Sequence, residues 1–403
     1  MPVPCSLLSR EAQLLVLTAG GPANEAPLRR LLASQLNWPT VGALARAERA
    51  TPIVWQWLQR LGADCLPVEV ATVWRKLAMV SEFESLRLEQ RLHESVAALA
   101  TRGIEVMLLK GSALAYTAYA AFAERPMGDL DLLVHPEQAR EAWSILQTLG
   151  WTWPATRWPA ERYTVHQHLP PLVDAHGQGF RLELHTDLLP GGQPFRLSAD
   201  TLWRDAQPIC LDGRTTLVPD PLQHLLHLCV HFAWSHQMQW ASWRTFRDVQ
   251  ALTRRGDIPW ATFVDLARDS RATTCCFWTL RLARDLARVT VPNDVLRALH
   301  PPLPEFLLDR LEHHYVLELF PTENSCPSVK LGRWLWEVGI APRRSEHGAG
   351  RPWQVSHGWC ESVAADTWPR RLLNRARHIG ASLGYVGRLL RQELGECPHG
   401  PRP

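Results

Sequence analysis

The stretch from residue 104 to residue 185 is the part of the chain that most restricts its fold. In the first hundred positions the apolar residues recur at helical spacing, whereas here they form short runs between turn-forming residues. One run is Ile104–Leu109, and another is Asp129–Val134, which is bounded by Gly128 and Pro136. Apolar residues that alternate over so few positions between turn residues are typical of β-strands.

Helical segments separate these strands from one another. We expect helices over Ala113–Phe122 and Glu137–Leu149, and two further strands over Leu172–Asp174 and Phe180–His185. Strands that alternate with helices along a chain are typical of a sheet packed against helices. The sequence therefore predicts an α/β sheet unit in the middle of the chain.

Helical patterning dominates both sides of this unit. Apolar residues at i, i+3 and i+4 spacing predict helices from residue 6 to about residue 100, including a long helix over Val68–Thr101. Residues 321–369 are rich in Pro, Gly and Trp and are expected to form loops, and Arg370–Leu394 is expected to form a basic amphipathic helix. After Asp220 the expected helices are Leu222–His236, Trp243–Arg254, Trp260–Ala267 and Thr274–Ala287.

The expected fold class is therefore α+β, with a small mixed β-sheet core flanked by N-terminal and C-terminal helical regions. This pattern divides the chain into four parts. They are an N-terminal helical region (1–102), the sheet core (103–215), a C-terminal helical domain (216–320), and a Trp- and Pro-rich segment that ends in the basic helix (321–403).

Composition and charge exclude several classes of protein. The 43 basic and 40 acidic residues leave a formal net charge of +3, so the chain lacks the positive field of a protein that binds long nucleic acids. Its 46% hydrophobic residues exclude a disordered chain. Nine dispersed cysteines without C-x-x-C spacing favour a reducing compartment, and no apolar run approaches the ~20 residues of a membrane-spanning helix. We therefore expect a cytoplasmic protein.

Two aspartates stand out in the second expected strand. Asp129 and Asp131 are two residues apart, so in a strand their side chains project from the same face. Two neighbouring carboxylates repel each other unless one is protonated or a cation lies between them. Hard divalent cations such as Mg²⁺ bind one or two carboxylates together with substrate phosphates. The alternative is an ordinary strand end with solvated aspartates.

A glycine and a serine lie where the first expected strand passes into a helix. Gly111 and Ser112 would let a phosphate approach the backbone, and the free N–H groups of a helix start favour anions. Lys110, one of only three lysines in the chain, precedes them and could act as a point charge on a triphosphate. Arg125 is a second candidate for a phosphate contact. For both cations the alternative is an ordinary surface position.

A third carboxylate lies on another expected strand. Arg181, Glu183 and His185 alternate with two leucines, so these three side chains share one face. A carboxylate here would complete a two-metal site together with the two aspartates. Such a site holds nucleotide phosphates and lowers the pKa of an attacking hydroxyl.

These motifs resemble the uncharacterised bacterial nucleotidyltransferase family of the DNA polymerase β-like superfamily. The resemblance covers roughly residues 75–290 and includes the helical region after residue 219. It is carried by Leu108-Leu109-Lys110-Gly111-Ser112-Ala113-Leu114, Arg125-Pro126, Asp129-Leu130-Asp131-Leu132-Leu133-Val134, Leu182-Glu183-Leu184-His185, Pro219-Asp220-Pro221, Leu225, His227, Cys229, His231, Trp243, Asp248 and Ile258-Pro259-Trp260.

The resemblance implies roles for the motif residues. Asp129, Asp131 and Glu183 become the expected metal ligands and catalytic carboxylates, and Gly111-Ser112 becomes the turn that holds phosphate. The expected nucleotide-binding residues are Lys110, Gly111, Ser112, Arg125 and His185.

The expected function is a Mg²⁺- or Mn²⁺-dependent transfer of an NMP from an NTP to an acceptor hydroxyl, with release of pyrophosphate. The acceptor is a small molecule, a natural-product peptide or a protein. One alternative is a nucleotide-binding module without turnover, such as a sensor, an antitoxin-like partner or a subunit of a biosynthetic complex. Another is an enzyme or partner that docks on a membrane surface or on a protein through Arg370–Leu394.

A histidine stripe lies outside these motifs. His224, His227 and His231 fall at i, i+3 and i+7, on one face of an expected helix, and His236 follows. Three interpretations stay open for this face: residues that line a cleft or support the fold, contacts to the nucleotide or acceptor, and metal ligands. The tryptophans of the C-terminal segment similarly fit either core positions or a surface that stacks on an acceptor.

Overall fold

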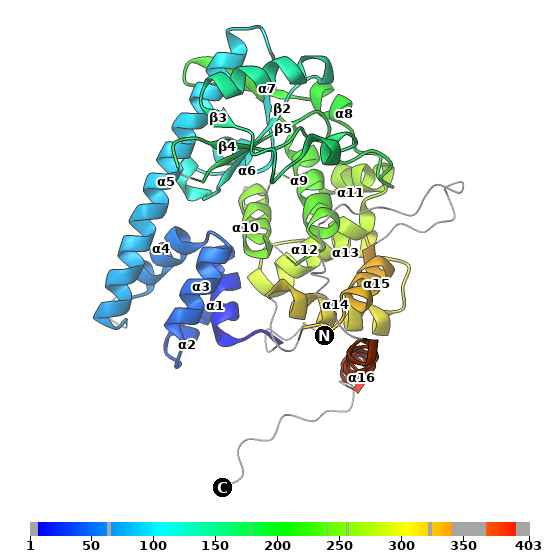
Figure 1. Cartoon of the computed structure of the whole chain (residues 1–403). Helices are drawn as coiled ribbons and strands as arrows, with labels where there is room; N and C mark the ends of the chain where they lie inside the picture. Colours follow the sequence, from blue (N-terminus) through cyan, green and yellow to red (C-terminus); the bar gives the residue numbers. More distant parts are fainter. Residues whose placement is uncertain are drawn as a thin grey trace.

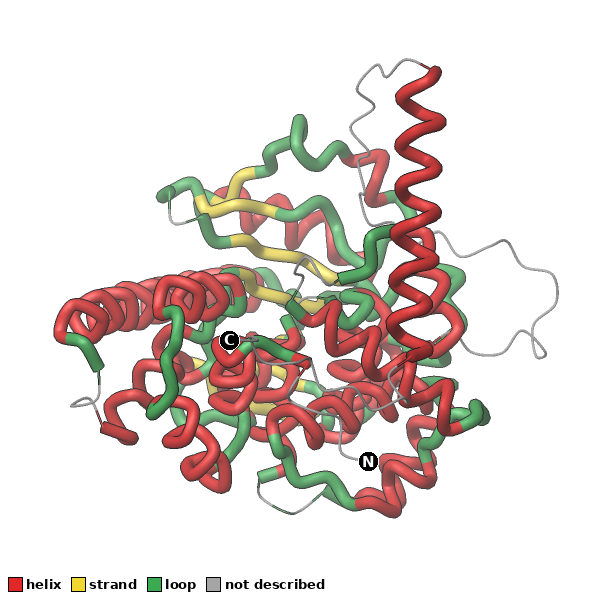
Figure 2. Tube along the Cα trace, turned by 90° about the horizontal axis from the view of Figure 1, so that it is seen from below, coloured by secondary structure: helices red, strands yellow, loops and turns green. Residues whose placement is uncertain are grey.

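The structure is a computed structural model of the 403-residue chain. It describes residues 7–62, 66–177, 179–239, 241–254, 256, 258–320, 325–340 and 368–391. The fold is a mostly helical α+β arrangement around one mixed sheet, as the sequence predicts (Figure 1). Viewed along another axis, the strands lie together with helices around them (Figure 2).

The described sheet has seven strands in the order β3-β4-β5-β2-β1-β7-β6. The β2–β5 and β1–β7 pairs are parallel, and the other neighbours are antiparallel. The strands are β1 (Met107–Leu108), β2 (Asp129–Leu133), β3 (Trp151–Thr152), β4 (Leu172–Asp174), β5 (Arg181–His185), β6 (Gln207–Leu211) and β7 (Arg214–Val218).

The sequence prediction of the strands was right in kind but incomplete. The first strand is shorter than predicted, and β3, β6 and β7 were missed. The β6–β7 hairpin carries a clear signal, because Asp212 and Gly213 both have positive φ (49° and 75°) in the turn between two alternating runs. An Asp-Gly pair is favoured at such a two-residue turn, so this hairpin could have been predicted.

The helices follow the predicted pattern in part: the helix predicted over Ala113–Phe122 is Lys110–Thr117, and the sequence analysis missed the helices Ala199–Arg204, Asn293–Ala298 and Glu305–Leu319. The long helix α5 (Val68–Ala100) has 33 residues and runs from the N-terminal helices to the sheet (Figure 1). The other helices before the last strand are α1 (Arg10–Ala19), α2 (Glu25–Leu32), α3 (Trp38–Ala47), α4 (Thr51–Gly62), α6 (Lys110–Thr117), α7 (Ala139–Thr148) and α8 (Ala199–Arg204).

The C-terminal half adds helices that pack with α1–α4 in one hydrophobic cluster. The predicted helix over Leu222–His236 is α9 (Pro221–Val230) followed by a π-helical turn, His231–Ser235. The further helices are α10 (Ser242–Thr253), α11 (Trp260–Asp269), α12 (Thr273–Ala287), α13 (Asn293–Ala298), α14 (Glu305–Leu319), α15 (Val329–Ile340) and α16 (Trp368–Arg391). No helix among the described residues is both long and apolar enough to cross a membrane.

Two predictions for the C-terminal segment have different outcomes. Residues 321–369 were predicted to be loops, but α15 lies among them, because Leu335, Trp336 and Ile340 recur at helical spacing and are buried. Most of the remaining segment, including Trp353, lies outside the described residues. The basic helix is present as α16, and its Tyr385 hydroxyl lies 2.7 Å from His314 Nδ1 on α14.

Helices from the two ends of the sequence pack into one hydrophobic cluster. The cluster joins α1–α4 to the helices after residue 220. Trp243 Nε1 on α10 donates to Thr18 Oγ1 on α1 at 3.0 Å, and Asn24 Nδ2 donates to the Ala287 carbonyl at 2.8 Å. A second cluster joins the C-terminal half of α5 and α7 to the sheet. The four-part division of the chain made above stays a prediction.

The second cluster yields a stability prediction. Leu132 on β2 is fully buried, so Leu132→Ala removes packed methyl groups and leaves a cavity. We expect a loss of about 2–5 kcal/mol in the free energy of unfolding, measured by denaturant unfolding followed by tryptophan fluorescence. Val165→Ala is the control, because Val165 is 76% exposed and its truncation should leave the midpoint unchanged. Equal effects of the two substitutions would contradict the packing described here.

Candidate functional site

The parallel pairing of β2 with β5 builds the centre of the candidate site. In this register Asp129 lies opposite Arg181, Asp131 opposite Glu183, and Leu133 opposite His185. The intervening leucines on both strands are buried in the sheet's core. Because strand side chains alternate between faces, this burial directs the acidic residues of both strands to the opposite face.

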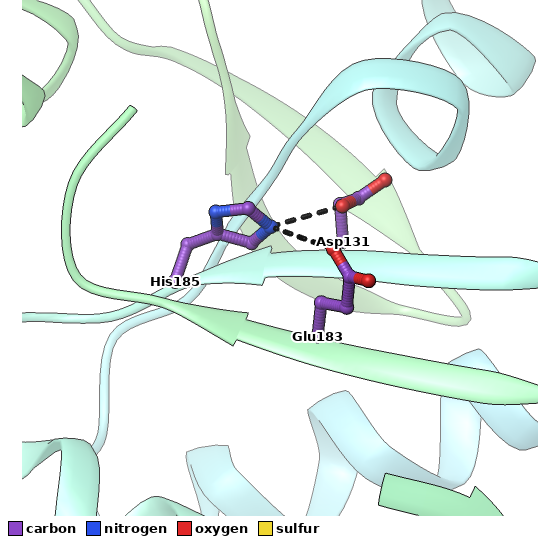
Figure 3. A group of neighbouring side chains, drawn as sticks. All are labelled: Asp131, Glu183 and His185. Atoms are coloured by element: carbon purple, nitrogen blue, oxygen red, sulfur yellow. Dashed lines mark hydrogen bonds and ion pairs between the residues drawn. The ribbon is translucent and has the colours of Figure 1, made fainter. Parts of the chain in front are cut away.

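Three ligand-type side chains converge on that face. Asp131, Glu183 and His185 each offer an oxygen or nitrogen atom, and the three atoms lie within 4.8 Å of one another (Figure 3). His185 Nε2 is 2.9 Å from Asp131 Oδ1 and 3.7 Å from Glu183 Oε2. His185 Nδ1 is buried without a hydrogen-bond partner among the described residues. The two carboxylates fit a hard divalent cation such as Mg²⁺ or Mn²⁺, whereas the imidazole nitrogen is a ligand that softer transition metals prefer.

Asp129 lies beside this group and not within it. Its carboxylate is 3.7 Å from Arg181 Nη2, and it lines the same cavity as Asp131 and Glu183. Of the three carboxylates expected as metal ligands, the structure therefore brings Asp131 and Glu183 together, and adds His185 to them.

Lys110 reaches into the same group from the start of α6. Its Nζ is 2.8 Å from Asp131 Oδ1, and its backbone has the left-handed φ of +46°, which is uncommon for a residue other than glycine. This conformation turns the chain sharply between the extended Leu109 and the helix. Lysine was expected at a phosphate, and here its ammonium neutralises an aspartate.

The turn residues Gly111 and Ser112 have different surroundings. A Cβ on Gly111 would lie 3.0 Å from Arg125 Nη1, so glycine lets this guanidinium lie against the helix start without being displaced. Ser112 is fully buried, and its hydroxyl accepts a hydrogen bond from the Asp131 backbone N–H at 3.1 Å. The Ser112 hydroxyl therefore connects α6 to β2. A phosphate at this turn would contact only the backbone of Ser112.

Arg125 is held in place by the C-terminal half of the chain. Its Nη2 and Nε donate to Asp248 Oδ2 and Oδ1 on α10 at 2.8 and 2.9 Å, and the Tyr119 hydroxyl donates to Asp248 Oδ1 at 2.7 Å. Asp248 is 1% exposed. Arg125 thus joins the sheet unit to α10 beside Gly111, and both Arg125 and Gly111 line the cavity described below.

Burial and close charges set the protonation of the central group. Burial alone would raise the pKa of Asp131, but the Lys110 ammonium and the His185 hydrogen bond outweigh it and lower the pKa to about 2. Burial also opposes ionisation of Glu183, yet His185 and other neighbouring groups hold its pKa well below the usual range. The pKa of Lys110 is raised, because the acidic neighbours overcome the burial of the ammonium.

The site opens into a cavity of about 220 Å³. Its described lining combines carboxylates, cations and the histidine stripe, while Ser112 and His185 lie behind its surface. The lining residues are Lys110, Gly111, Leu114, Arg125, Met127, Asp129, Asp131, Arg181, Glu183, His224, His227, Leu228, His231, His236, Ala241, Arg244, Thr245 and Asp248.

The histidine stripe therefore lines a cleft, which was one of its three interpretations. His224 and His227 are almost fully buried, and both ring nitrogens of His227 lack a hydrogen-bond partner among the described residues. Burial lowers the pKa of His224 to about 4 and holds that of His227 well below its usual value. Both rings are neutral near pH 7 and offer one donor and one acceptor each.

Sequence reasoning missed two residues near the site. His168 Nε2 lies 3.6 Å from Glu183 Oε2, and its ring packs edge-on against His185. Arg244 on α10 lines the cavity, and its Nε is buried without a partner in the described part of the chain. Neither residue belongs to a recognisable motif, because His168 forms only an isolated β-bridge with His185 outside the strands and Arg244 is one of many arginines in the chain.

The buried His224 ring yields a prediction for stability against pH. Its folded-state pKa of about 4 lies below the ordinary value of 6.5, so the unfolded chain takes up this proton first as the pH falls. Its contribution to stability is complete above pH 6.5 and decreases towards pH 4, by up to about 1.4 kcal/mol per pH unit. His224→Gln should flatten this part of the profile in unfolding experiments between pH 7 and 4, and His378→Gln, at an exposed position on α16, should not. An unchanged profile in His224→Gln would contradict the buried neutral ring.

Comparison with known proteins gives one match, to a protein family. Neither the curated proteins nor the solved structures contain a significant match to this chain. A family model described as uncharacterised nucleotidyltransferase matches residues 34–288, which is more than half of the chain and includes every residue of the site described above. The chain belongs to this uncharacterised nucleotidyltransferase family.

Proposed function

We propose that the protein is a divalent-metal-dependent enzyme that transfers an NMP from an NTP to an acceptor hydroxyl and releases pyrophosphate. The observation that carries the proposal is the convergence of Asp131, Glu183 and His185 beside the first turn of α6. The expected relation to the DNA polymerase β-like superfamily is part of the proposal, and the family match supports its reaction class.

The carboxylates on β2 and β5 would hold the metal. Asp131 and Glu183 lie close enough to share a cation, and Asp129 would join them on the nucleotide side of the cavity. When bound, Mg²⁺ or Mn²⁺ neutralises phosphate charge and lowers the pKa of an attacking hydroxyl. Glu183 and Asp131 are ionised near pH 7, so no proton has to leave them before a cation binds.

Cations and backbone amides would hold the triphosphate. The first N–H groups of α6, at Lys110, Gly111 and Ser112, precede the first intrahelical donor, which is the Ala113 N–H. Arg125 and Lys110 add positive charge on either side of this turn. Such fixed donors stabilise the charge that develops during phosphoryl transfer.

The acceptor would approach from the α9 side of the cavity. The enclosed volume of about 220 Å³ is below the ~300–1,000 Å³ of a typical small-molecule site. It suits a triphosphate and a reacting hydroxyl, while the rest of the acceptor lies outside. This arrangement is compatible with a small molecule, a natural-product peptide or a protein side chain, and the neutral His227 ring is suited to hydrogen-bond an uncharged hydroxyl.

A non-catalytic nucleotide-binding module is the second candidate function. One observation favours it: the Lys110 ammonium already lies on Asp131 at 2.8 Å, where it competes with a metal ion. In that case NTP would bind without being turned over. Catalysis would require Lys110 to leave Asp131 when a nucleotide binds, and the phosphates of that nucleotide would be its new partners.

Substitution of Asp131 tests the catalytic proposal. Asp131→Asn removes a charged ligand, so we expect at least about 10³-fold slower release of pyrophosphate, since metal stabilisation of the transition state is worth several kcal/mol. The assay uses each α-labelled NTP with Mg²⁺ or Mn²⁺ and follows pyrophosphate and label transfer. Asp212→Asn is the control, because Asp212 lies in the exposed β6–β7 turn, where asparagine also fits a positive φ.

Metal removal separates the two candidate functions. Chelation with EDTA should abolish label transfer and pyrophosphate release, and added Mn²⁺ or Mg²⁺ should restore both. NTP that binds but is never turned over with any metal or acceptor would favour the non-catalytic module. Turnover that persists in EDTA, or in Asp131→Asn, would overturn the metal-dependent mechanism.

A further inference from the structure

A second pocket is lined by a different face of α10 from the one that lines the carboxylate cavity. It encloses about 360 Å³ between α4, α10, the residues after α6 and the turn after α1, and it shares no lining residue with the candidate site. We call it the arginine pocket. Its lining residues are Gly20, Gly21, Pro22, Ile53, Gln56, Trp57, Arg60, Tyr119, Arg247, Gln250, Ala251 and Arg254.

The arginine pocket is positively charged. Arg60, Arg247 and Arg254 line it, and its described lining contains no carboxylate. Arg247 and Arg254 are seven residues apart on α10, so they lie on one face about 10 Å apart along the helix axis. Planar guanidinium groups bind phosphate oxygens through two parallel N–H donors, so two of them on one face of a helix favour an anionic phosphate ligand.

The arginines are positioned but not neutralised within the pocket. Arg254 Nη2 donates to the Ala118 carbonyl at 2.9 Å, a neutral acceptor, and no carboxylate among the described residues pairs with Arg254. Arg247 Nε is buried without a hydrogen-bond partner in the described part of the chain. Among the described residues, the acidic contact of these three arginines is that of Arg60 with Glu25 at 3.2 Å, and Arg60 and Glu25 are both partly exposed there. A buried guanidinium donor without a partner is costly, and an anionic ligand would satisfy it.

Aromatic and carboxamide side chains line the pocket beside the arginines. The Trp57 ring lies 5.4 Å from the Arg60 guanidinium carbon, and the Tyr119 ring lies 5.5 Å from that of Arg247. Gln56 and Gln250 add carboxamides, which donate and accept hydrogen bonds. Aromatic faces stack on a ring of any base, and carboxamides pair with its edge. The pocket therefore offers a place for a ring as well as for phosphates.

We infer that the arginine pocket is a second nucleotide site, which binds a nucleoside diphosphate or a similar ring-bearing phosphate without a metal ion. Three arginines would balance the negative charge of the ligand's phosphates here, as a metal ion would at the carboxylates. The ligand would rest against Tyr119, whose hydroxyl bonds Asp248, the partner of Arg125 at the phosphate turn. The inference stands independently of the proposed catalytic function, because it requires neither metal nor turnover.

Binding of ADP to the full chain in EDTA tests this inference. Chelation removes any metal held at the carboxylates, and the variants of the two sites then assign the remaining binding to one site or the other. We expect ADP to bind more tightly than adenosine or pyrophosphate, measured by calorimetry. Arg247→Gln/Arg254→Gln should weaken it at least 10-fold, and Asp129→Asn/Asp131→Asn should leave it unchanged.

Matched controls separate lost contacts from lost charge or fold. Arg75→Gln/Arg297→Gln changes the net charge equally at two exposed positions outside the pocket and should bind ADP as the parent does. If thermal unfolding shows that the α10 double variant is unstable, Arg60→Gln on a different helix takes its place and should weaken ADP binding. Three outcomes would each overturn the inference. ADP fails to bind in EDTA at roughly millimolar ligand, pyrophosphate binds as tightly as ADP, or the pocket variants leave ADP binding unchanged. Failure of the catalytic proposal would appear instead as absent metal-dependent turnover with ADP binding intact.

Discussion

The site depends on the neutralisation of two like charges that parallel strand pairing places side by side. The register of β2 and β5 sets Asp131 opposite Glu183. Asp131 is buried and Glu183 is partly buried, so the repulsion between the two carboxylates is stronger than in water. Lys110 and His185 supply the compensation from the start of α6 and the end of β5. Without such partners the carboxylates would take up protons. The ionised state of the two carboxylates therefore depends on both the strand register and the α6 turn.

Helix α10 connects this unit to the rest of the molecule. Its Arg244 and Asp248 line the carboxylate cavity, its Arg247 lines the arginine pocket, and Asp248 also holds Arg125 beside Gly111. Because 3.6 residues make one helical turn, Arg244 and Asp248 share one face of α10, whereas Arg247 is turned about 100° away from Asp248 around the axis. One helix therefore contacts both the first turn of α6, through Arg125, and the arginine pocket.

Local patterning was sufficient to predict the central strands, the long helix α5 and the face shared by Asp131, Glu183 and His185, because strand alternation and helical spacing act over a few residues. It could not show that Asp129 stands apart from the ligand group, since this depends on Arg181 opposite it. It also could not place His168 or Arg244 at the site. Their roles arise from tertiary contacts that no local period encodes.

Local patterns also could not predict that the N-terminal helices and the helices after residue 220 share one hydrophobic core. The position of α10 is set by contacts to residues about two hundred positions earlier: Trp243 Nε1 donates to Thr18 Oγ1, and the Trp243 backbone N–H donates to Glu48 Oε2 at 3.1 Å. Asp248 on α10 in turn accepts hydrogen bonds from Arg125, and Arg125 lies against Gly111 in the first turn of α6. The N-terminal helices, which contain none of the motif residues, thus support the candidate site through α10, and their packing is part of its geometry.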